Sequence, residues 1–124
     1  MKLIERSNYT ERIERAFGKG VIVALTGQRR VGKSCIMAQV MRHIGSLPQA
    51  NVVYLNKEKN EFDDIRDYND LLGFVNGRLS KDKDNYLFID EIQDIDGFER
   101  ALRSLQADDA CQIMVTGSNA KMLS

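Results

Sequence analysis

The chain has 124 residues, of which 43% are hydrophobic and 29% are charged, a composition that fits one soluble globular domain. Lys and Arg total 18 and Asp and Glu total 18, so the net charge is zero and argues neither for nor against the binding of nucleic acid. The two cysteines do not make a disulfide framework, and the longest apolar run, Val21 to Leu25, is too short to cross a bilayer. We therefore expect a cytoplasmic protein with no membrane partner.

The charges are unevenly distributed along the chain. Residues 1–49 carry nine basic and three acidic side chains, whereas the remainder carries nine basic and fifteen acidic ones. One explanation is that the two segments fold against each other with their charges on solvated faces, so that their opposite net charges cancel. The alternative is a local anion-binding site in the first half, where Arg29, Arg30 and Lys33 stand close together.

The apolar residues alternate between helical and strand periods along the chain. The predicted order is a helix over 10–17, a strand over 21–25, a helix over 33–44, a strand over 52–55, a helix through 68–79, a strand over 86–89, a helix over 98–105 and a strand over 113–115. Residues 57–67 are highly charged and are expected to form a loop. Asp96 is the predicted N-cap of the last helix, with Glu99 completing a capping box. This alternation predicts an α/β fold, a parallel sheet with helices on both faces.

A phosphate-binding loop is the most specific motif in the sequence. The pattern G-x-x-x-x-G-K-[ST] is matched in full by Gly27, Gln28, Arg29, Arg30, Val31, Gly32, Lys33 and Ser34, with Cys35 next. A chance match is expected in well under ~1% of chains of this length. The match also follows a buried strand and opens a helix, so its N–H groups and helix dipole would hold the phosphates of ATP. Lys33 would reach the β- and γ-phosphates, and the Ser34 hydroxyl would ligate Mg²⁺.

An acidic pair, Asp90 and Glu91, follows the predicted strand over 86–89. Asp90 is expected to hold Mg²⁺, which usually takes one or two carboxylates and several waters. Glu91 is expected to orient or deprotonate the attacking water as a general base. The alternative is that both are only polar residues that leave a strand, and the upstream phosphate loop favours the functional interpretation.

Polar residues also follow the other predicted strands. Thr116 and Ser118, with Asn119 behind them, are candidates to sense the γ-phosphate or the water, although a plain turn explains each of them equally well. Asn56 either hydrogen-bonds Glu91 and restrains it, or is an ordinary turn residue. The segment 56–59 lacks the final Asp of N-K-x-D, so adenine is expected rather than guanine.

Two further residues have weaker signals. Cys35 opens the predicted helix, a position that can activate a thiol, but a packing role is the simpler interpretation. His43 lies away from other metal-ligand types and is expected at the surface or at a helix end.

With these motifs in view, the chain resembles the bacterial and archaeal AAA-like P-loop ATPases. The resemblance runs essentially end to end, and its distinctive strings are Phe88-Ile89-Asp90-Glu91-Ile92-Gln93 and Val115-Thr116-Gly117-Ser118. Arg29 matches the family's arginine at the third loop position, whereas Arg30 and Cys35 depart from its usual Gln and Thr. The resemblance implies the strand order 1-4-3-2.

The resemblance also implies that this chain is the N-terminal ATPase core of a longer protein. A fifth strand, a lid and a C-terminal domain would follow it. The fifth strand normally lies beside the strand over 21–25, so that strand is expected to form an exposed edge that invites self-association.

Three functions remain open from the sequence. The first is Mg-dependent ATP hydrolysis that drives or switches an attached domain, with nucleic acid as one conceivable partner. The second is a nucleotide-binding regulatory module with little turnover. The third, phosphate transfer to a small molecule, is disfavoured by the acidic pair.

Overall fold

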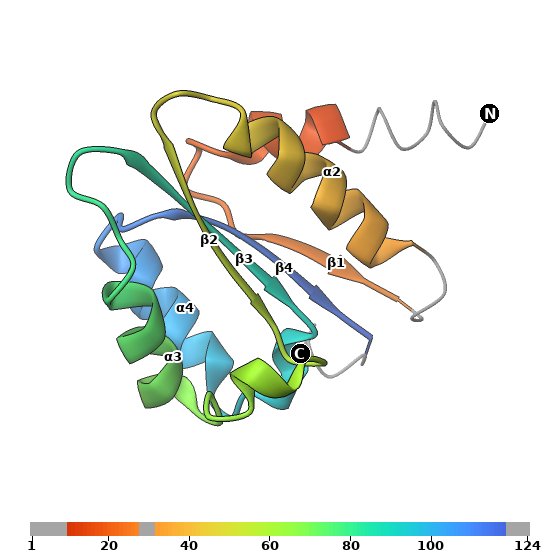
Figure 1. Cartoon of the computed structure of the whole chain (residues 1–124), viewed down its shortest axis with the longest axis vertical. Coiled ribbons are helices and arrows are strands. Elements are labelled where there is room, and N and C mark those ends of the chain that lie inside the picture. Colours follow the sequence, from red (N-terminus) through yellow and green to blue (C-terminus); the bar gives the residue numbers. More distant parts are fainter. Residues whose placement is uncertain (1–9, 28–31, 119–124) are drawn as a thin grey trace.

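The computed structural model describes residues 10–27 and 32–118 and shows alternating strands and helices (Figure 1). Residues 10–16 are helical. The elements that follow are β1 (Val23–Thr26), α2 (Lys33–Gly45), β2 (Ala50–Asn56), η2 (Asn60–Phe62), α3 (Tyr68–Asn76), β3 (Asp84–Asp90), η3 (Ile92–Asp94), α4 (Phe98–Ala107) and β4 (Gln112–Gly117). Every predicted helix and strand is therefore present.

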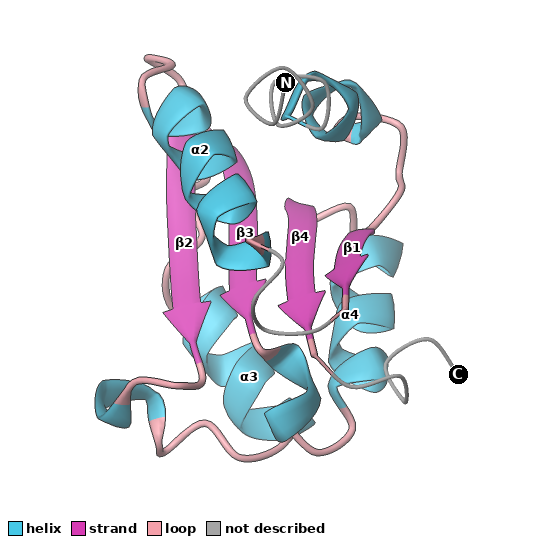
Figure 2. Cartoon of the chain, turned by 90° about the vertical axis from the view of Figure 1, so that its right-hand side faces the viewer, coloured by secondary structure: helices cyan, strands magenta, loops and turns pink. Residues whose placement is uncertain are grey.

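The strands form one parallel sheet in the order β1-β4-β3-β2. This confirms the expected 1-4-3-2 order. In the register, Ile89 of β3 lies opposite Leu55 of β2 on one side and Val115 of β4 on the other. Figure 2 shows the four strands pointing the same way, so their carboxyl ends share one edge of the sheet. Ligands of open α/β sheets bind at this edge.

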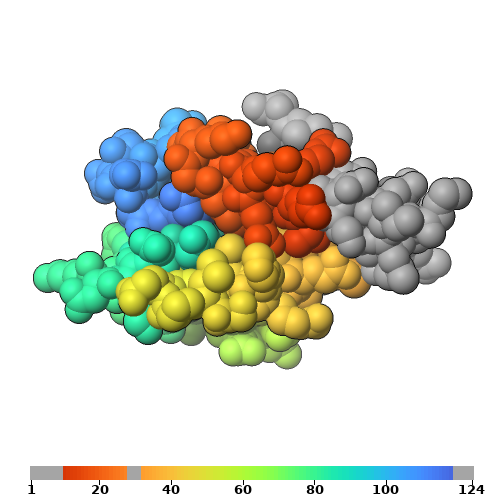
Figure 3. Space-filling model, turned by 90° about the horizontal axis from the view of Figure 1, so that it is seen from above, coloured from red at the N-terminus to blue at the C-terminus, as the bar shows by residue number. Residues whose placement is uncertain are grey.

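Helices cover both faces of the sheet, which is why its strands are continuously apolar rather than alternating. The segment 10–16 and α2 lie side by side on one face, seen from above in red and gold (Figure 3), and α3 and α4 cover the other (Figure 1). Phe88 packs with Met37 and Val40 of α2, whereas Leu87 and Ile89 pack toward the α3 and α4 side. Successive residues of β3 thus fill two separate cores.

The start of α4 differs from the prediction. Its N-cap is Gly97, with φ +70°, and no side chain caps this helix, so the capping box that begins at Asp96 is wrong. Asp96 instead forms a parallel bridge with Asp67, and its N–H donates to the Arg66 carbonyl at 2.9 Å. A Cβ at Gly97 would come 3.2 Å from the ring of Tyr68, so this position has both a backbone and a packing reason to be glycine.

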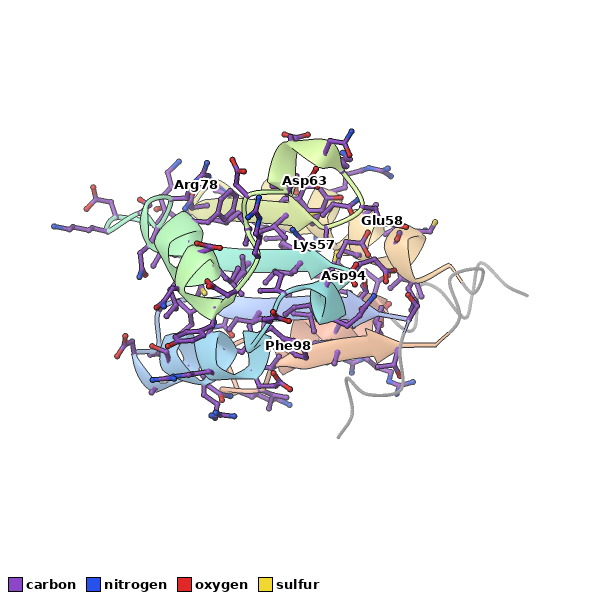
Figure 4. All side chains as sticks on the ribbon, turned by 90° about the horizontal axis from the view of Figure 1, so that it is seen from below. Lys57, Glu58, Asp63, Arg78, Asp94 and Phe98 are labelled. Carbon is purple, nitrogen blue, oxygen red and sulfur yellow. The ribbon has the colours of Figure 1, made fainter. Side chains whose placement is uncertain are left out.

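The charged segment over 57–67 is a loop, as expected, but it contains the short turn η2. Lys57 fastens this loop, because its Nζ donates to the carbonyls of Phe62 at 2.8 Å and Ile65 at 2.6 Å. Figure 4 shows Glu58 and Asp94 toward the carboxyl ends of the strands, with Arg78 toward the opposite end of the molecule. No helix in the described part of the chain is long and apolar enough to cross a membrane.

Candidate functional site

The N-terminus of α2 has no side-chain cap and no acidic residue in its first turn that would compete with a bound anion. Its N-cap is Gly32, with φ +81°. The contrast is α3, where Asp67 accepts from the backbone N–H of Asp70 at 2.9 Å. The first N–H groups of a helix lack intrahelical acceptors and its N-terminus is partly positive, so the uncapped start of α2 is better suited to an anion than the capped start of α3. Residues 28–31, with the predicted Gln28, Arg29, Arg30 and Val31, lie outside the described residues.

Lys33 connects the phosphate loop to the end of β4. Its side chain is buried, and Nζ donates to the carbonyls of Gly27 at 2.6 Å and Gly117 at 2.9 Å. Gly27 itself has φ +134°, a conformation that L side chains rarely adopt. The ammonium group is therefore held between the predicted phosphate loop and the end of β4, beside the candidate residues Thr116 and Ser118.

Ser34, Asp90 and Thr116 form one hydrogen-bonded chain across three elements. The Ser34 hydroxyl donates to Asp90 Oδ2 at 2.8 Å, and the Thr116 hydroxyl donates to Asp90 Oδ1. Thr116 also accepts from the backbone N–H of Glu91 at 3.1 Å. A hydroxyl and a carboxylate oxygen this close are hard oxygen donors of the kind that Mg²⁺ prefers, so these residues fit the ion.

Glu91 has an unusual backbone for a side-chain-bearing residue. Its φ is +59° and its ψ is 54°, a left-handed conformation that carries strain outside glycine. Its carboxylate is almost fully buried, and Oε1 accepts from the Ser118 hydroxyl and from Gln93 Nε2 at 2.7 Å. The strained turn directs this carboxylate back toward the end of β4.

The structure brings together most of the sequence-predicted residues. Lys33, Ser34, Asp90, Glu91, Thr116 and Ser118 form one connected cluster, whereas Asn119 lies outside the described residues. Asn56 stands opposite Asp90 in the register, but its side-chain oxygen accepts from the Glu58 N–H at 2.9 Å. This contact is the one expected of an ordinary turn asparagine.

The two weak candidates lie on exposed parts of α2. Cys35 is exposed in the first turn, and its sulfur is 4.0 Å from Gln39 Nε2. His43 is an exposed residue in the last turn, and its Nδ1 lies 2.6 Å from Glu14, which confirms the surface role.

Three contacts of the cluster could not be anticipated from residue types. The carbonyls of Gly27 and Gly117 hold Lys33, and main-chain oxygens leave no mark in a sequence. Gln93 contacts Glu91 although no periodicity distinguishes it. The only signal for Gln93 was its place in the Asp-Glu-Ile-Gln string.

A cavity of about 550 Å³ lies at the opposite edge, where β3 and β4 begin. Its walls include Glu14 and Asp84 together with Lys81 and Lys83, a mixture of charges that selects no single ligand. Burial, and then the negative charges of Asp84 and Glu14, raise the pKa of Tyr86, which also lines it. The hydrogen-bonded cluster that includes Asp90 is not part of this cavity.

Comparisons with known proteins assign the chain to a family. A family model described as an AAA domain matches residues 19–124. An uncharacterised protein of Haemophilus influenzae is 29% identical over 98% of this chain, and one of Methanocaldococcus jannaschii is 32% identical over 83%. The crystal structure of Cdc6p from Pyrobaculum aerophilum superposes on 95% of the chain with a TM-score of 0.71 and 13% identity. The last comparison bears on the fold alone.

The chain spans 31% of the length of the Haemophilus protein and 22% of the Methanocaldococcus protein. It covers 40% of the Cdc6p chain.

Proposed function

The chain belongs to the AAA-domain family, and from this premise we propose that it binds Mg-ATP on the phosphate loop and hydrolyses it. The observation that carries the proposal is the continuous chain of contacts from Ser34 through Asp90 and Thr116 to the backbone of Glu91. It joins the phosphate loop to the acidic pair at the carboxyl edge of the sheet. A nucleotide-binding, ATPase-like role is what the family supports, and hydrolysis is the step proposed here.

Each residue of the cluster has a distinct role in this proposal. The N–H groups at the start of α2 bind the phosphates, and Lys33 exchanges its carbonyl partners for β- and γ-phosphate oxygens. Ser34 and Asp90 hold Mg²⁺, which when bound supplies positive charge against the triphosphate. Asp90 is already oriented by the buried hydroxyl of Thr116, so its carboxylate needs little reorganisation.

Glu91 takes the proton of the attacking water in this mechanism. Ser118 bonds its Oε1, so Ser118 links the carboxylate to the end of β4, where a change at the γ-phosphate would be sensed. Glu91 must turn its carboxylate from these internal donors toward a water molecule before it can act as a base. Hydrolysis therefore includes a rearrangement of Glu91.

The occupied carboxylate of Glu91 also favours a second candidate, a nucleotide-binding regulatory module with little turnover. Gln93 and Ser118 both donate hydrogen bonds to Oε1 of Glu91, so this oxygen is engaged within the protein. In that case bound ATP would order the domain for a partner without rapid hydrolysis.

Turnover separates the two candidates. Phosphate release and ATP binding are measured for the wild type and for Glu91→Gln, with any native flanking sequence retained. Hydrolysis predicts that Glu91→Gln loses at least about a hundredfold in kcat and keeps its affinity for ATP. Wild-type turnover as low as that of Glu91→Gln, with tight binding in both, supports the regulatory module. Transfer of phosphate to an added small acceptor would overturn both.

We also propose that this core belongs to a longer protein, in which the nucleotide state drives or switches an attached domain. The relatives of this chain are about three to five times longer than the part that matches it. Self-association of the core is part of the same proposal. Nucleic acid as a partner has no support from the net charge of zero.

A further inference from the structure

Gln93 lies in η3, two residues after Glu91, and its side chain returns to the acidic pair. Its Nε2 donates to Glu91 Oε1 at 2.7 Å, and Ser118 donates to the same oxygen. We propose that Gln93 is a positioning residue that restrains Glu91 in a resting state, and that breaking this amide contact raises basal ATP hydrolysis. The inference rests on the proposed function, because a restraint on turnover presupposes turnover.

The orientation of the Gln93 amide follows from its partner. The two ends of a glutamine amide are assigned from their hydrogen bonds rather than seen directly. With the amide reversed, its oxygen would face Glu91 Oε1, and two acceptors would repel each other. The donating end therefore faces the carboxylate, and the contact is charge-assisted and stronger than one between neutral groups.

This contact opposes catalysis rather than assisting it. A carboxylate oxygen that already accepts two hydrogen bonds is a weaker acceptor for a proton of water. Both donors converge on one oxygen of Glu91, whose residue is 3% exposed and whose backbone is fixed by the N–H bond to Thr116. Gln93 and Ser118 therefore compete with water for this side of the base.

The other end of Gln93 makes the restraint easy to release. Its Oε1 is buried and has no hydrogen-bond partner among the described residues. A buried carbonyl without a donor is unfavourable, so the resting position satisfies only half of this amide. A rotation that gives Oε1 a donor would gain a hydrogen bond while it frees Glu91.

The first test compares steady-state ATP hydrolysis and ATP binding for the wild type, Gln93→Leu and Gln106→Leu, with any native flanking sequence retained. Gln106 is the matched control, because its Nε2 donates at 2.5 Å to the Gly20 carbonyl, away from the acidic pair. The proposal predicts that Gln93→Leu raises kcat about fivefold, which equals about 1 kcal/mol of lost restraint, with ATP affinity unchanged. Gln106→Leu should leave both quantities unchanged.

Two controls make the kinetic result specific. The double variant Glu91→Gln with Gln93→Leu should have no hydrolysis, because the added turnover passes through Glu91. Circular dichroism should show that both leucine variants are folded like the wild type. An unchanged or lowered kcat in folded Gln93→Leu overturns the restraint.

A second measurement tests the contact without reference to turnover. Nuclear magnetic resonance follows solvent exchange of the side-chain amide protons of Gln93 and Gln106 in the wild type and in Glu91→Ala. The proposal predicts that Gln93 exchanges at least about fivefold faster in Glu91→Ala, while Gln106 is unchanged. Equal Gln93 rates in both proteins overturn the contact. If the wild type and Gln93→Leu both lack hydrolysis while this exchange difference is present, the proposed hydrolysis and the restraint on it are refuted, and the contact between Gln93 and Glu91 is retained.

Discussion

Replacing Thr116 by valine tests the structural account of the acidic pair. Thr116 is fully buried at the end of β4, where its hydroxyl donates to Asp90 and accepts from the Glu91 N–H. Valine has nearly the same shape, so the substitution removes the hydroxyl without opening a large cavity. The change therefore isolates two hydrogen bonds.

The magnitude follows from what each partner loses. A hydrogen bond to a charged group contributes about 1.5–3 kcal/mol, and a buried donor left unsatisfied costs about 1–3 kcal/mol. Because the two terms share one hydroxyl and are not additive, we expect the free energy of unfolding of Thr116→Val to fall by about 3 kcal/mol. The left-handed backbone of Glu91 should also lose its anchor, since the Thr116 oxygen holds its N–H.

The assay is urea unfolding followed by circular dichroism, where a lower midpoint at an unchanged slope reports lost stability. Thr116→Ser is the matched control, because it keeps the hydroxyl and loses only a methyl group, at a cost of about 1 kcal/mol. The reasoning is refuted if Thr116→Val unfolds within about 1 kcal/mol of the wild type, or if serine is as destabilising as valine.

Two further predictions concern the cysteines and the edge of the sheet. Burial raises the pKa of Cys111 to about 11, so near pH 8 its thiol is almost entirely protonated, and alkylation should be much faster at the exposed Cys35. Mg-ATP should protect Cys35, and mass spectrometry that shows equal rates, or no protection, would contradict this. β1 pairs only with β4 among the described residues, and Val21 beside it is 51% exposed, so the isolated chain should self-associate as its concentration rises. Light scattering that finds a monomer at every concentration would contradict self-association through β1.

The elements and layers were accessible from the sequence because the signals were redundant, whereas the strand order was expected only from the family resemblance. β3 reads Tyr86-Leu87-Phe88-Ile89 without alternation, and the structure shows the reason, since Leu87 and Phe88 fill cores on opposite faces. The backbone of Gly32 is left-handed, a conformation that glycine favours. This feature depends on the residue itself and can therefore be expected from the local sequence. Strand ends could then be assigned to one edge of the sheet by topology alone.

Features that depend on distant partners were not accessible. Asp96 and Glu99 have the spacing of a capping box, but a bridge to Asp67 draws Asp96 away and Gly97 becomes the N-cap. The left-handed conformation of Glu91 is held by Thr116, which is 25 residues away. Neither contact has a local sequence signal, because each depends on how separate elements meet in the fold.

The central claim, that the loop opening at Gly27 is a nucleotide site, is tested most directly by calorimetry. Binding of Mg-ATP, Mg-GTP and Mg-ADP is measured for the wild type and for Lys33→Ala, with any native flanking sequence retained and folding checked by circular dichroism. The account predicts tight binding of Mg-ATP, weaker binding of Mg-GTP, and a loss of at least about tenfold in Mg-ATP affinity on Lys33→Ala. A folded wild type that binds no nucleotide, or a folded Lys33→Ala variant that binds Mg-ATP as tightly as the wild type, would contradict it.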